Sequence, residues 1–253
     1  MKHRISAFFI AAGAALMLFS LPAFAVDLHQ AAYVSGTDTY AYGHNSIPSM
    51  PVAGAPQDTD WNRWAMLHDG SVYRLYAFRS GSRDTFYQFG FNAQTGAYEF
   101  GYQSIPVLQI TSVPKSASTN TFSMLHDGDT YRLYLQDKAD PSLLHQFGFN
   151  PGSATYEYGH NSIAALRVTS MPADTDWNRW AMLHDGTDYR FYAFKRDSRS
   201  QFYQAAYNTS QQQYVFGYQS IPKLTLSGFP QGVSTGSFAM LHDRGDYRVY
   251  FND

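Results

Sequence analysis

The segment L-H-D-G-S-V-Y-R-L-Y at residues 67–76 decides the fold, because near copies of it recur along the chain at one fixed interval. The histidine of each copy lies 58 residues after the previous one, at His68, His126, His184 and His242. A second phrase, G-[YH]-[QN]-S-I, recurs at the same interval and begins at residues 43, 101, 159 and 217. Repeats of fixed period indicate supersecondary units that bury their apolar faces against their neighbours.

The residue content of the repeat predicts an all-β protein. The chain contains 20 Tyr and 19 Phe, and aromatic residues favour pleated, half-buried surfaces. Turn-forming residues interrupt the apolar runs, and no helical periodicity extends beyond about two turns after the first 25 residues. In the copy at 101–158 the pattern predicts short strands at 107–113, 122–126, 131–135, 144–149 and 156–158.

The two ends of the repeated region predict a closed ring. Residues 29–42 match the second half of a repeat, as at 203–216, whereas the chain stops at 247–251 in the first half of one. The two fragments add up to one repeat, which gives four in total. Since open sheet edges promote aggregation, we expect a closed four-bladed β-propeller of 58-residue repeats, with the last blade completed by the N-terminal strands.

The order of an apolar strand, a Gly turn and further aromatics at residues 67–76 resembles the repeat of hemopexin-like four-bladed β-propellers. The resemblance covers about ten residues in each copy, the repeat here is longer, and the bridging cysteine pair of that family is missing. It implies a four-bladed ring, and by analogy an ion in the central channel.

The first 25 residues have the features of a signal peptide. Lys2 and Arg4 precede an apolar run from Ile5 to Leu21, and an A-x-A site predicts cleavage after Ala25. We therefore expect a secreted or periplasmic protein in which residues 26–253 form one domain. The chain has no cysteine, which excludes disulfides and thiolate metal sites.

Charge and hydropathy narrow the classes of partner. Cleavage would remove two basic residues and no acidic one, which leaves a net charge of −4 on the mature chain. This balance argues against a nucleic-acid partner and provides no polybasic surface for anionic lipid. No second long apolar run is present, so we expect no membrane span, and we expect a monomer.

The four copies alternate in sequence. Residues 58–70 and 174–186 are identical, and all four Trp residues lie in these two odd copies, at Trp61, Trp64, Trp177 and Trp180. Since alternate blades of a four-bladed ring face each other, the alternation predicts two equivalent sites. The alternative is that the alternation records a two-step duplication without functional meaning.

Trp61 and Trp177 have no counterpart in the even copies and stand among acidic, amide and guanidinium groups. An indole beside planar hydrogen-bonding groups suits a sugar ring. The predicted ligand-binding residues are Asp60, Trp61, Asn62 and Arg63, their copies Asp176, Trp177, Asn178 and Arg179, and His44 and His160, which mark the same copies. The alternative is that these tryptophans pack in a loop.

Other repeated groups have structural interpretations that we favour. Asp69 and Gly70 are expected to form a hairpin turn, with His68 packing on or bonding to a neighbouring blade. An alternative is that His68, His126, His184 and His242 ring the channel and bind a metal ion. Arg74 and its copies are expected to pair with an aspartate such as Asp69. Asp58 and Asp60 resemble part of a calcium loop, but the glycine and the distal glutamate are absent.

The sequence therefore predicts a binding protein, lectin-like with two carbohydrate sites on opposite blades. The alternatives are a protein-recognition module, such as an adhesin, an inhibitor or a toxin-neutralising protein, and a glycan-active hydrolase. No G-x-S-x-G, H-E-x-x-H, phosphate loop or dinucleotide motif is present. We therefore assign no catalytic residues, expect no cofactor, and expect a glycan or a cell-surface protein as the partner.

Overall fold

The structure is a computed structural model that describes residues 24–253. This part of the chain forms 20 β-strands and no helix, so the prediction of an all-β protein is confirmed. It follows that no helix in residues 24–253 is long and apolar enough to cross a membrane. The predicted signal peptide, residues 1–25, lies outside the described residues except for its last two.

The strands form four units of the same plan, each with three long strands and two short ones. Unit 1 comprises β4 (Thr59–His68), β5 (Tyr73–Arg79), β6 (Thr85–Asn92), β7 (Ala97–Phe100) and β8 (Val107–Thr111). Unit 2 comprises β9 (Ala117–His126), β10 (Tyr131–Asp137), β11 (Leu143–Asn150), β12 (Thr155–Tyr158) and β13 (Ala165–Thr169). Unit 3 comprises β14 (Thr175–His184), β15 (Tyr189–Lys195), β16 (Gln201–Asn208), β17 (Gln213–Phe216) and β18 (Lys223–Ser227). Unit 4 comprises β19 (Ala239–Asp243), β20 (Asp246–Asn252), β1 (Phe24–Val34), β2 (Thr39–Tyr42) and β3 (Ser49–Ala53).

Within each unit the long strands are antiparallel and the outermost one has a divided edge. In unit 1, β4 pairs with β5 and β5 with β6. The second half of β6 then pairs with β7, while its first half pairs with β8. The outer edge of each unit is therefore shared by two short strands that lead in opposite directions around the molecule.

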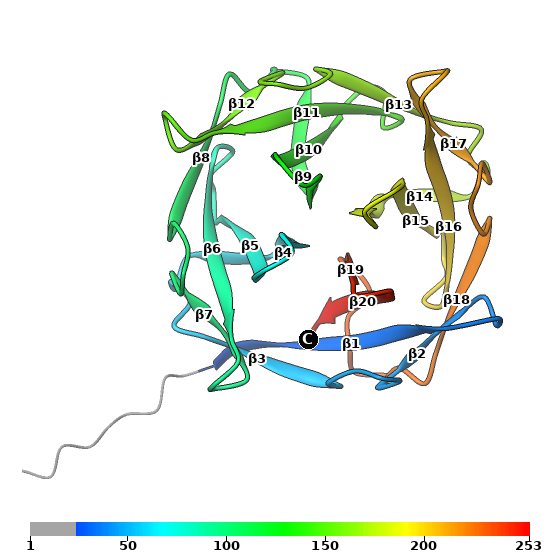
Figure 1. The fold of residues 1–253 in the computed structure, drawn as a ribbon, viewed down its shortest axis with the longest axis horizontal. Coiled ribbons are helices and arrows are strands. Elements are labelled where there is room, and N and C mark those ends of the chain that lie inside the picture. Colours follow the sequence, from blue (N-terminus) through cyan, green and yellow to red (C-terminus); the bar gives the residue numbers. More distant parts are fainter. Residues whose placement is uncertain (1–23) are drawn as a thin grey trace, which may run out of the picture.

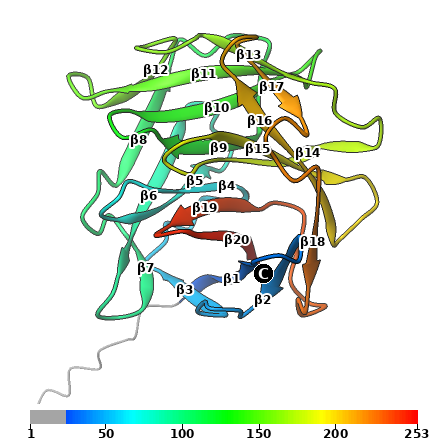
Figure 2. The same ribbon diagram turned by 45° about the vertical axis from the view of Figure 1, so that its right-hand side comes forward.

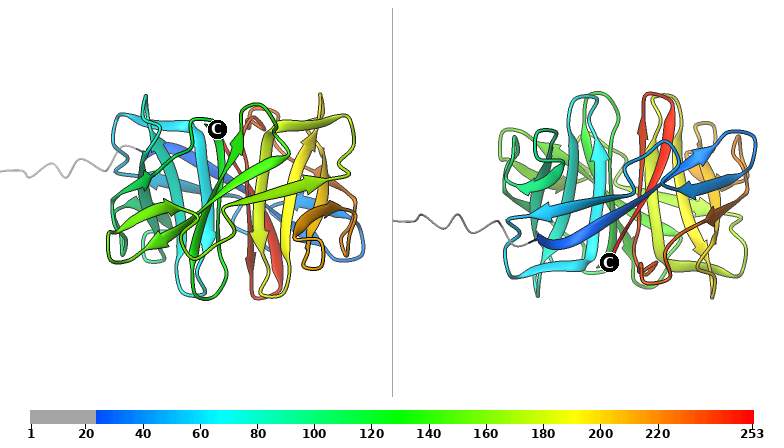
Figure 3. Two further views of the ribbon diagram at one scale, coloured as in Figure 1. Left: turned by 90° about the horizontal axis from the view of Figure 1, so that it is seen from above. Right: turned by 90° about the horizontal axis from the view of Figure 1, so that it is seen from below.

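These short strands join neighbouring units through four parallel pairs. The pairs are β8 with β12, β13 with β17, β18 with β2, and β3 with β7. As a result all 20 strands belong to one sheet, which runs around a central axis with β4, β9, β14 and β19 innermost (Figure 1). Hairpin loops project from both faces of this ring (Figure 3).

The chain ends meet in unit 4. β1 pairs antiparallel with β20, from Leu28 opposite Asn252 to Ala32 opposite Arg248, and the two strands lie side by side in Figure 2. The N–H of Asp253 donates to the carbonyl of Asp27 at 3.3 Å. The pairing of the first segment with the last strand is the one that the divided repeat predicts.

The apolar core consists of four clusters, each shared by two neighbouring units. In one of them Trp64 and Met66 of unit 1 pack with Leu28 and Met50 of unit 4. The other three clusters lie at the remaining junctions between units. Trp64 is 2% exposed and belongs to this core. Because no unit closes a core alone, each depends on both neighbours.

The boundaries of the units differ from the sequence copies in one respect that matters for the site. The phrases G-H-N-S-I at residues 43–47 and 159–163 follow β2 and β12, and so belong to units 4 and 2. The tryptophan-rich segments begin β4 and β14, in units 1 and 3. Two features that mark the same copies in the sequence therefore lie on different units.

Substitution of Leu28→Ala tests the closure of the ring. Leu28 is fully buried in β1, so we expect its truncation to lower the free energy of unfolding by about 2–5 kcal/mol, measured by urea denaturation. The control is Ser35→Ala in the exposed turn after β1, which should change stability by less than about 0.5 kcal/mol. Equal stability of Leu28→Ala and the wild type would contradict the structural role of β1.

Candidate functional site

The repeated L-H-D-G segment forms a clamp between units. Asp69 Oδ1 accepts hydrogen bonds from the N–H groups of Ser71 at 3.0 Å and Val72 at 2.8 Å, which fixes the predicted hairpin turn. Asp69 Oδ2 accepts from Arg74 Nε at 2.8 Å, and from the hydroxyl of Tyr131 in unit 2 at 2.9 Å. One buried carboxylate thus holds its own turn, its own arginine and the next unit.

The same contact between units recurs around the ring. The tyrosine hydroxyls donate in turn to the aspartates of the preceding unit, in the pairs Tyr189 to Asp127 at 3.4 Å, Tyr247 to Asp185 at 2.9 Å, and Tyr73 to Asp243. The predicted pairing of the repeated arginine with aspartate is confirmed at Asp69, and it recurs at Asp127 and Asp185. In unit 4 the arginine, Arg248, pairs with Asp246 instead.

These contacts lower the pKa values of two clamp carboxylates, Asp69 and Asp185. Burial of Asp185 disfavours its charged form, but the N–H of Asp188, the Arg190 guanidinium and the Tyr247 hydroxyl outweigh burial and hold the pKa of Asp185 at about 2. At Asp69 burial is likewise outweighed by donors of the same kinds, and its pKa lies well below the ordinary value. The clamps at Asp69 and Asp185 are therefore charged, fully bonded junctions near neutral pH.

The four repeated histidines lie around the central axis, but they do not form a metal site. Each ring packs on the tyrosine of its own unit, as His68 does on Tyr73 with ring centroids 4.3 Å apart. His184 Nδ1 lies 3.1 Å from the carbonyl oxygen of His126, and burial lowers the pKa values of His126 and His242. Residues 24–253 contain no group of three or more His, Asp or Glu side chains placed to hold a metal ion.

Most of the polar groups at the predicted Trp61 site already form hydrogen bonds within the protein. Arg63 Nε donates to Asp60 Oδ2 at 2.7 Å, and its two terminal nitrogens donate to the carbonyl oxygens of Ser82 and Arg79 at 2.8 and 3.0 Å. The ring of Trp61 packs on a buried phenylalanine. Arg179, Asp176 and Trp177 in unit 3 repeat this arrangement. Asn62 and Asn178 are exposed.

His44 and His160 do not join these tryptophan loops. The loop that contains His44 lies at the Arg248 end of its unit, because Arg248 Nη1 donates to the neighbouring carbonyl of Asn45 at 3.1 Å. The Trp61 loop lies at the other end of the strands. Across the hairpin Asp60 is opposite Phe78 and Leu67 is opposite Arg74, and these partners are four residues apart along β5, which corresponds to about 13 Å. The predicted site residues therefore lie on opposite faces of the ring.

The aspartates that resemble a calcium loop also have protein partners. Asp58 accepts a hydrogen bond from Tyr87 at 2.7 Å and pairs with Arg79 at 2.8 Å. Asp60 Oδ1 accepts a hydrogen bond from the N–H of Asn62 at 3.1 Å. These carboxylates stabilise the start of β4.

The concave sites of the molecule lie elsewhere, as four equivalent clefts at the junctions between units. We name each cleft by its arginine. The Arg74, Arg132, Arg190 and Arg248 clefts have cavity volumes of about 330, 400, 270 and 200 Å³. One unit contributes its Y-R-x-Y strand, a buried glutamine and the G-[YH]-[QN]-S-I loop, and the next unit contributes three aromatic rings. In the Arg132 cleft the main lining residues are Arg132, Tyr134, Gln146, Ser162, Ile163, Tyr189, Tyr207 and Tyr214.

The isoleucine of each loop lines its cleft, and three of the four are unusually exposed. Ile47, Ile105 and Ile163 are 53%, 42% and 46% exposed, and they are three of the four large apolar side chains that are exposed in residues 24–253. Ile221 occupies the same place in the Arg190 cleft. Exposed apolar groups that gather at a concave site mark a surface for binding.

The serine that precedes the isoleucine adds an unsatisfied polar atom. The hydroxyl oxygens of Ser104 and Ser162 are buried and have no hydrogen-bond partner within the described chain. Ser104 lines the Arg74 cleft and Ser162 the Arg132 cleft. Buried hydroxyl groups without partners are costly, so these atoms are available to a ligand or to water.

The repeated loop sequence that lines these clefts was visible in the sequence but was not predicted to form a binding site. The phrase G-[YH]-[QN]-S-I repeats as strictly as L-H-D-G, yet we gave it no role beyond marking the period. Its function depends on contacts between units: Arg74 Nη1 donates to the carbonyl of Gln103 at 3.0 Å, and Gln88 Oε1 accepts from the N–H of Ile105 at 3.2 Å.

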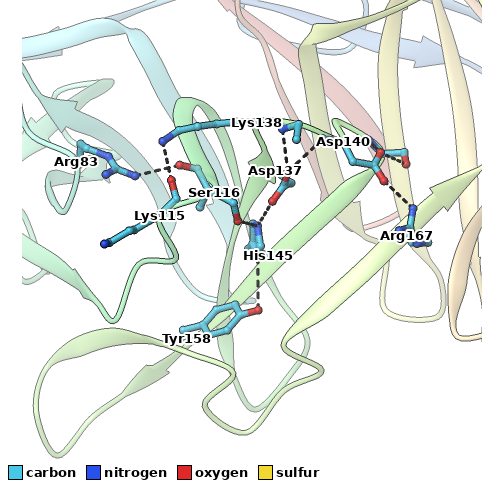
Figure 4. Close-up of polar contacts among 12 residues, drawn as sticks. Arg83, Lys115, Ser116, Asp137, Lys138, Asp140, His145, Tyr158 and Arg167 are labelled. Atoms are coloured by element: carbon cyan, nitrogen blue, oxygen red, sulfur yellow. Dashed lines mark hydrogen bonds and ion pairs between the residues drawn. The ribbon is translucent and has the colours of Figure 1, made fainter.

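One polar cluster outside the clefts has the composition of a catalytic triad but not its geometry. His145 Nε2 lies 3.1 Å from Asp137 Oδ2 and 3.4 Å from Ser116 Oγ, while Nδ1 faces the hydroxyl of Tyr158 at 3.5 Å (Figure 4). A triad needs the carboxylate and the hydroxyl on different ring nitrogens. Hydrogen bonds from Ser116, the N–H of Ala139 and His145 hold the pKa of Asp137 well below its ordinary value.

This cluster explains part of the alternation between units. The place of His145 is taken in units 1 and 3 by Tyr87 and Tyr203, which donate to Asp58 and Asp174. In unit 4 it is taken by His29, which lies 3.3 Å from the hydroxyl of Tyr42. At this equivalent position, the odd units therefore use a tyrosine and the even units a histidine to form the polar contact.

Comparisons with known proteins yield 21 matching chains of solved structures, three of which follow. No protein-family model and no curated protein matches the sequence. One neighbour is AofleA from Arthrobotrys oligospora, at 12% identity and a TM-score of 0.37 over 86% of this chain and 61% of that one. Another is the six-bladed β-propeller lectin of Aleuria aurantia, described with a fucose recognition mode, at 12% identity and a TM-score of 0.35 over 87% and 62%. A 6-phosphogluconolactonase candidate from Bacteroides fragilis has 12% identity and a TM-score of 0.32 over 86% and 61%. The chain thus spans 61–62% of the length of these structures.

The clamps predict a specific dependence of stability on pH. Because folding lowers the pKa of Asp185 from 3.8 to about 2, its stabilisation is complete above about pH 4 and is lost as the pH falls toward 2. We expect Asp185→Asn to lower the free energy of unfolding at pH 7 by about 2 kcal/mol and to weaken its fall below pH 4, measured by denaturation over a pH series. Asp197→Asn, at an exposed carboxyl, is the control and should follow the wild type. An unchanged pH profile of Asp185→Asn would contradict the clamp.

Proposed function

We propose that the ring is a closed four-bladed β-propeller and that residues 26–253 form a single domain. The four units of equal plan, their cyclic junctions and the pairing of β1 with β20 support this interpretation. In addition, parallel strand pairs hydrogen-bond each unit to its neighbours, a connection that the blades of a propeller do not need. The resemblance to hemopexin-like propellers stays a prediction.

We also propose that the protein is exported, to the periplasm or the medium, and that it acts as a monomer. The signal-peptide pattern of residues 1–25 supports export. The ring has no free lateral edge between units, which supports a monomer.

We propose that the protein is lectin-like and binds saccharides in the clefts between units. The observation that carries this proposal is the strict recurrence, at every junction, of an isoleucine of the loop opposite tyrosine rings and an arginine. Apolar side chains and ring faces receive the C–H face of a sugar, and guanidinium, serine and tyrosine groups receive its hydroxyls. Such a site orients a ligand and assembles no nucleophile, which supports binding rather than catalysis.

The ring would make such binding multivalent. The clefts are fixed to one rigid sheet and separated by one unit each, so a surface with repeated glycans can occupy more than one at a time. The second contact is then intramolecular, and the overall affinity exceeds that of a single cleft. This arrangement suits recognition of a polysaccharide or a glycosylated cell surface.

The earlier expectation of two sites at Trp61 and Trp177 is the competing location. Its exposed amides Asn62 and Asn178 remain available, whereas Arg63 and Arg179 already donate to the protein. We therefore place the saccharide in the clefts, and the following experiment separates the two locations.

The test uses a glycan array and two double variants of the full protein. We expect the wild type to bind one class of glycan, and Ile105→Ser with Ile163→Ser to weaken that binding by about tenfold or more, because both side chains are exposed and their loss removes apolar contact without opening the core. Trp61→Ala with Trp177→Ala is the matched comparison and should bind as the wild type does.

Three outcomes would contradict the proposal. Loss of binding only in the tryptophan variant would move the site to the loops. No binding to any glycan, together with tight capture of a purified cell-surface protein, would favour the protein-recognition alternative. Hydrolysis of a bound glycan by the pure protein would make it an enzyme.

A further inference from the structure

The four clefts differ at one position of the repeat. The residue before the tyrosine of Y-R-x-Y ends the hairpin turn and stands beside the cleft arginine. It is Val72 in the Arg74 cleft, Thr130 in the Arg132 cleft, Asp188 in the Arg190 cleft and Asp246 in the Arg248 cleft. The clefts therefore form two pairs, and this pairing differs from the alternation of odd and even units.

The aspartates of the second pair occupy the arginine. Asp188 Oδ2 accepts a hydrogen bond from Arg190 Nη2 at 2.9 Å, and Asp246 Oδ2 accepts one from Arg248 Nη2 at 2.9 Å. In the first pair, Nη2 of Arg74 and of Arg132 has no hydrogen-bond partner in residues 24–253, although Nε and Nη1 of both arginines are bonded. These two clefts thus present a free guanidinium donor.

The loop serines follow this division only in part, because the buried hydroxyl of Ser46, in the loop of unit 4, also has no partner in the described chain. Ser104 and Ser162, in the Arg74 and Arg132 clefts, have buried hydroxyls without partners. Ser220, in the Arg190 cleft, donates to the carbonyl of Gln204 at 3.4 Å. A free donor and a free hydroxyl therefore occur together in the first pair.

The backbone beneath the loops also differs between the pairs. A Cβ at Gly90 or Gly148 would lie 2.1 Å from a carbonyl oxygen of the loop, so the loop approaches the strand too closely for any side chain. Units 3 and 4 have Ala206 and Ala32 at the equivalent places. Units 1 and 2 thus share a tighter loop, and their clefts are the larger two, at about 330 and 400 Å³.

From these differences we infer that only the Arg74 and Arg132 clefts bind saccharide, with arginine Nη2 donating to an acceptor oxygen of the sugar, and that Asp188 and Asp246 act as built-in occupants of the other two. The inference rests on the proposed saccharide-binding function. The acceptor is a hydroxyl or a carboxylate, since a guanidinium serves both. The two active clefts flank unit 2, so binding is bivalent across one unit.

The test exchanges the residue between the pairs. Val72→Asp with Thr130→Asp supplies the missing carboxylate to the first pair, and Asp188→Thr with Asp246→Val removes it from the second. The hairpin backbone tolerates either residue, because the N–H groups of Val72 and Asp188 both lie 2.8 Å from the aspartate that begins the turn. Circular dichroism and thermal unfolding show that each variant folds.

The probes are methyl α-glucoside and methyl α-glucuronide, titrated into the full protein by calorimetry. These sugars differ only in a hydroxymethyl or carboxylate group, so their comparison identifies the acceptor. We expect the wild type to bind about two equivalents of at least one probe, the first variant to bind about tenfold more weakly, and the second to bind about four equivalents.

The outcomes that overturn the inference differ from those that overturn the proposed function. Four equivalents in the wild type, unchanged affinity in the first variant, or no binding of either probe to a protein that binds glycans on an array would each refute the inference alone. No glycan binding in any assay would refute the proposed function, and the inference with it.

Discussion

The half-buried hydrogen bond from a tyrosine of one unit to the turn aspartate of the preceding unit is the contact on which the ring depends. Asp69 receives Tyr131, and the same step recurs at Asp127, Asp185 and Asp243 until the circle is complete. At the first three, the carboxylate also caps its own turn and pairs with its own arginine. Because one carboxylate serves both the turn and the junction, the local conformation and the placement of neighbouring units are fixed together, and the clefts follow from that placement.

The four units of the ring differ from one another in sequence in two separate ways. Alternation of odd and even units affects internal polar pairs, in which Tyr87 with Asp58 in unit 1 corresponds to His145 with Asp137 in unit 2. The division of units 1 and 2 from units 3 and 4 affects the clefts, through the residue beside the arginine and the glycine beneath the loop. The first pattern concerns packing, whereas the second changes the groups that a ligand would meet.

Much of the fold could be predicted from the chain, since the fixed interval, the turn residues and the divided repeat are local signals. They predicted the strand composition, the hairpin at Asp69 and the pairing of the first segment with the last strand. The parallel pairs between units could not be predicted, because β7 and β8 are too short for their partners to be read from periodicity. The site was misjudged for a related reason. Trp61 stands out in the sequence, but its neighbours Asp60 and Arg63 bond to each other. The clefts gather residues from two units, and that proximity exists only once the ring is formed.

The pairing of β1 with β20 also constrains how this molecule can reach its native state. The two strands come from opposite ends of the polypeptide, and unit 4 cannot assemble until both are present. Units 1 to 3 can form early from nearby segments, but until unit 4 forms they would expose unpaired strand edges and partly covered apolar clusters. Pairing of segments so far apart in the sequence gives the fold a high contact order, which slows folding. The last step of folding is therefore the one that removes the aggregation-prone intermediate.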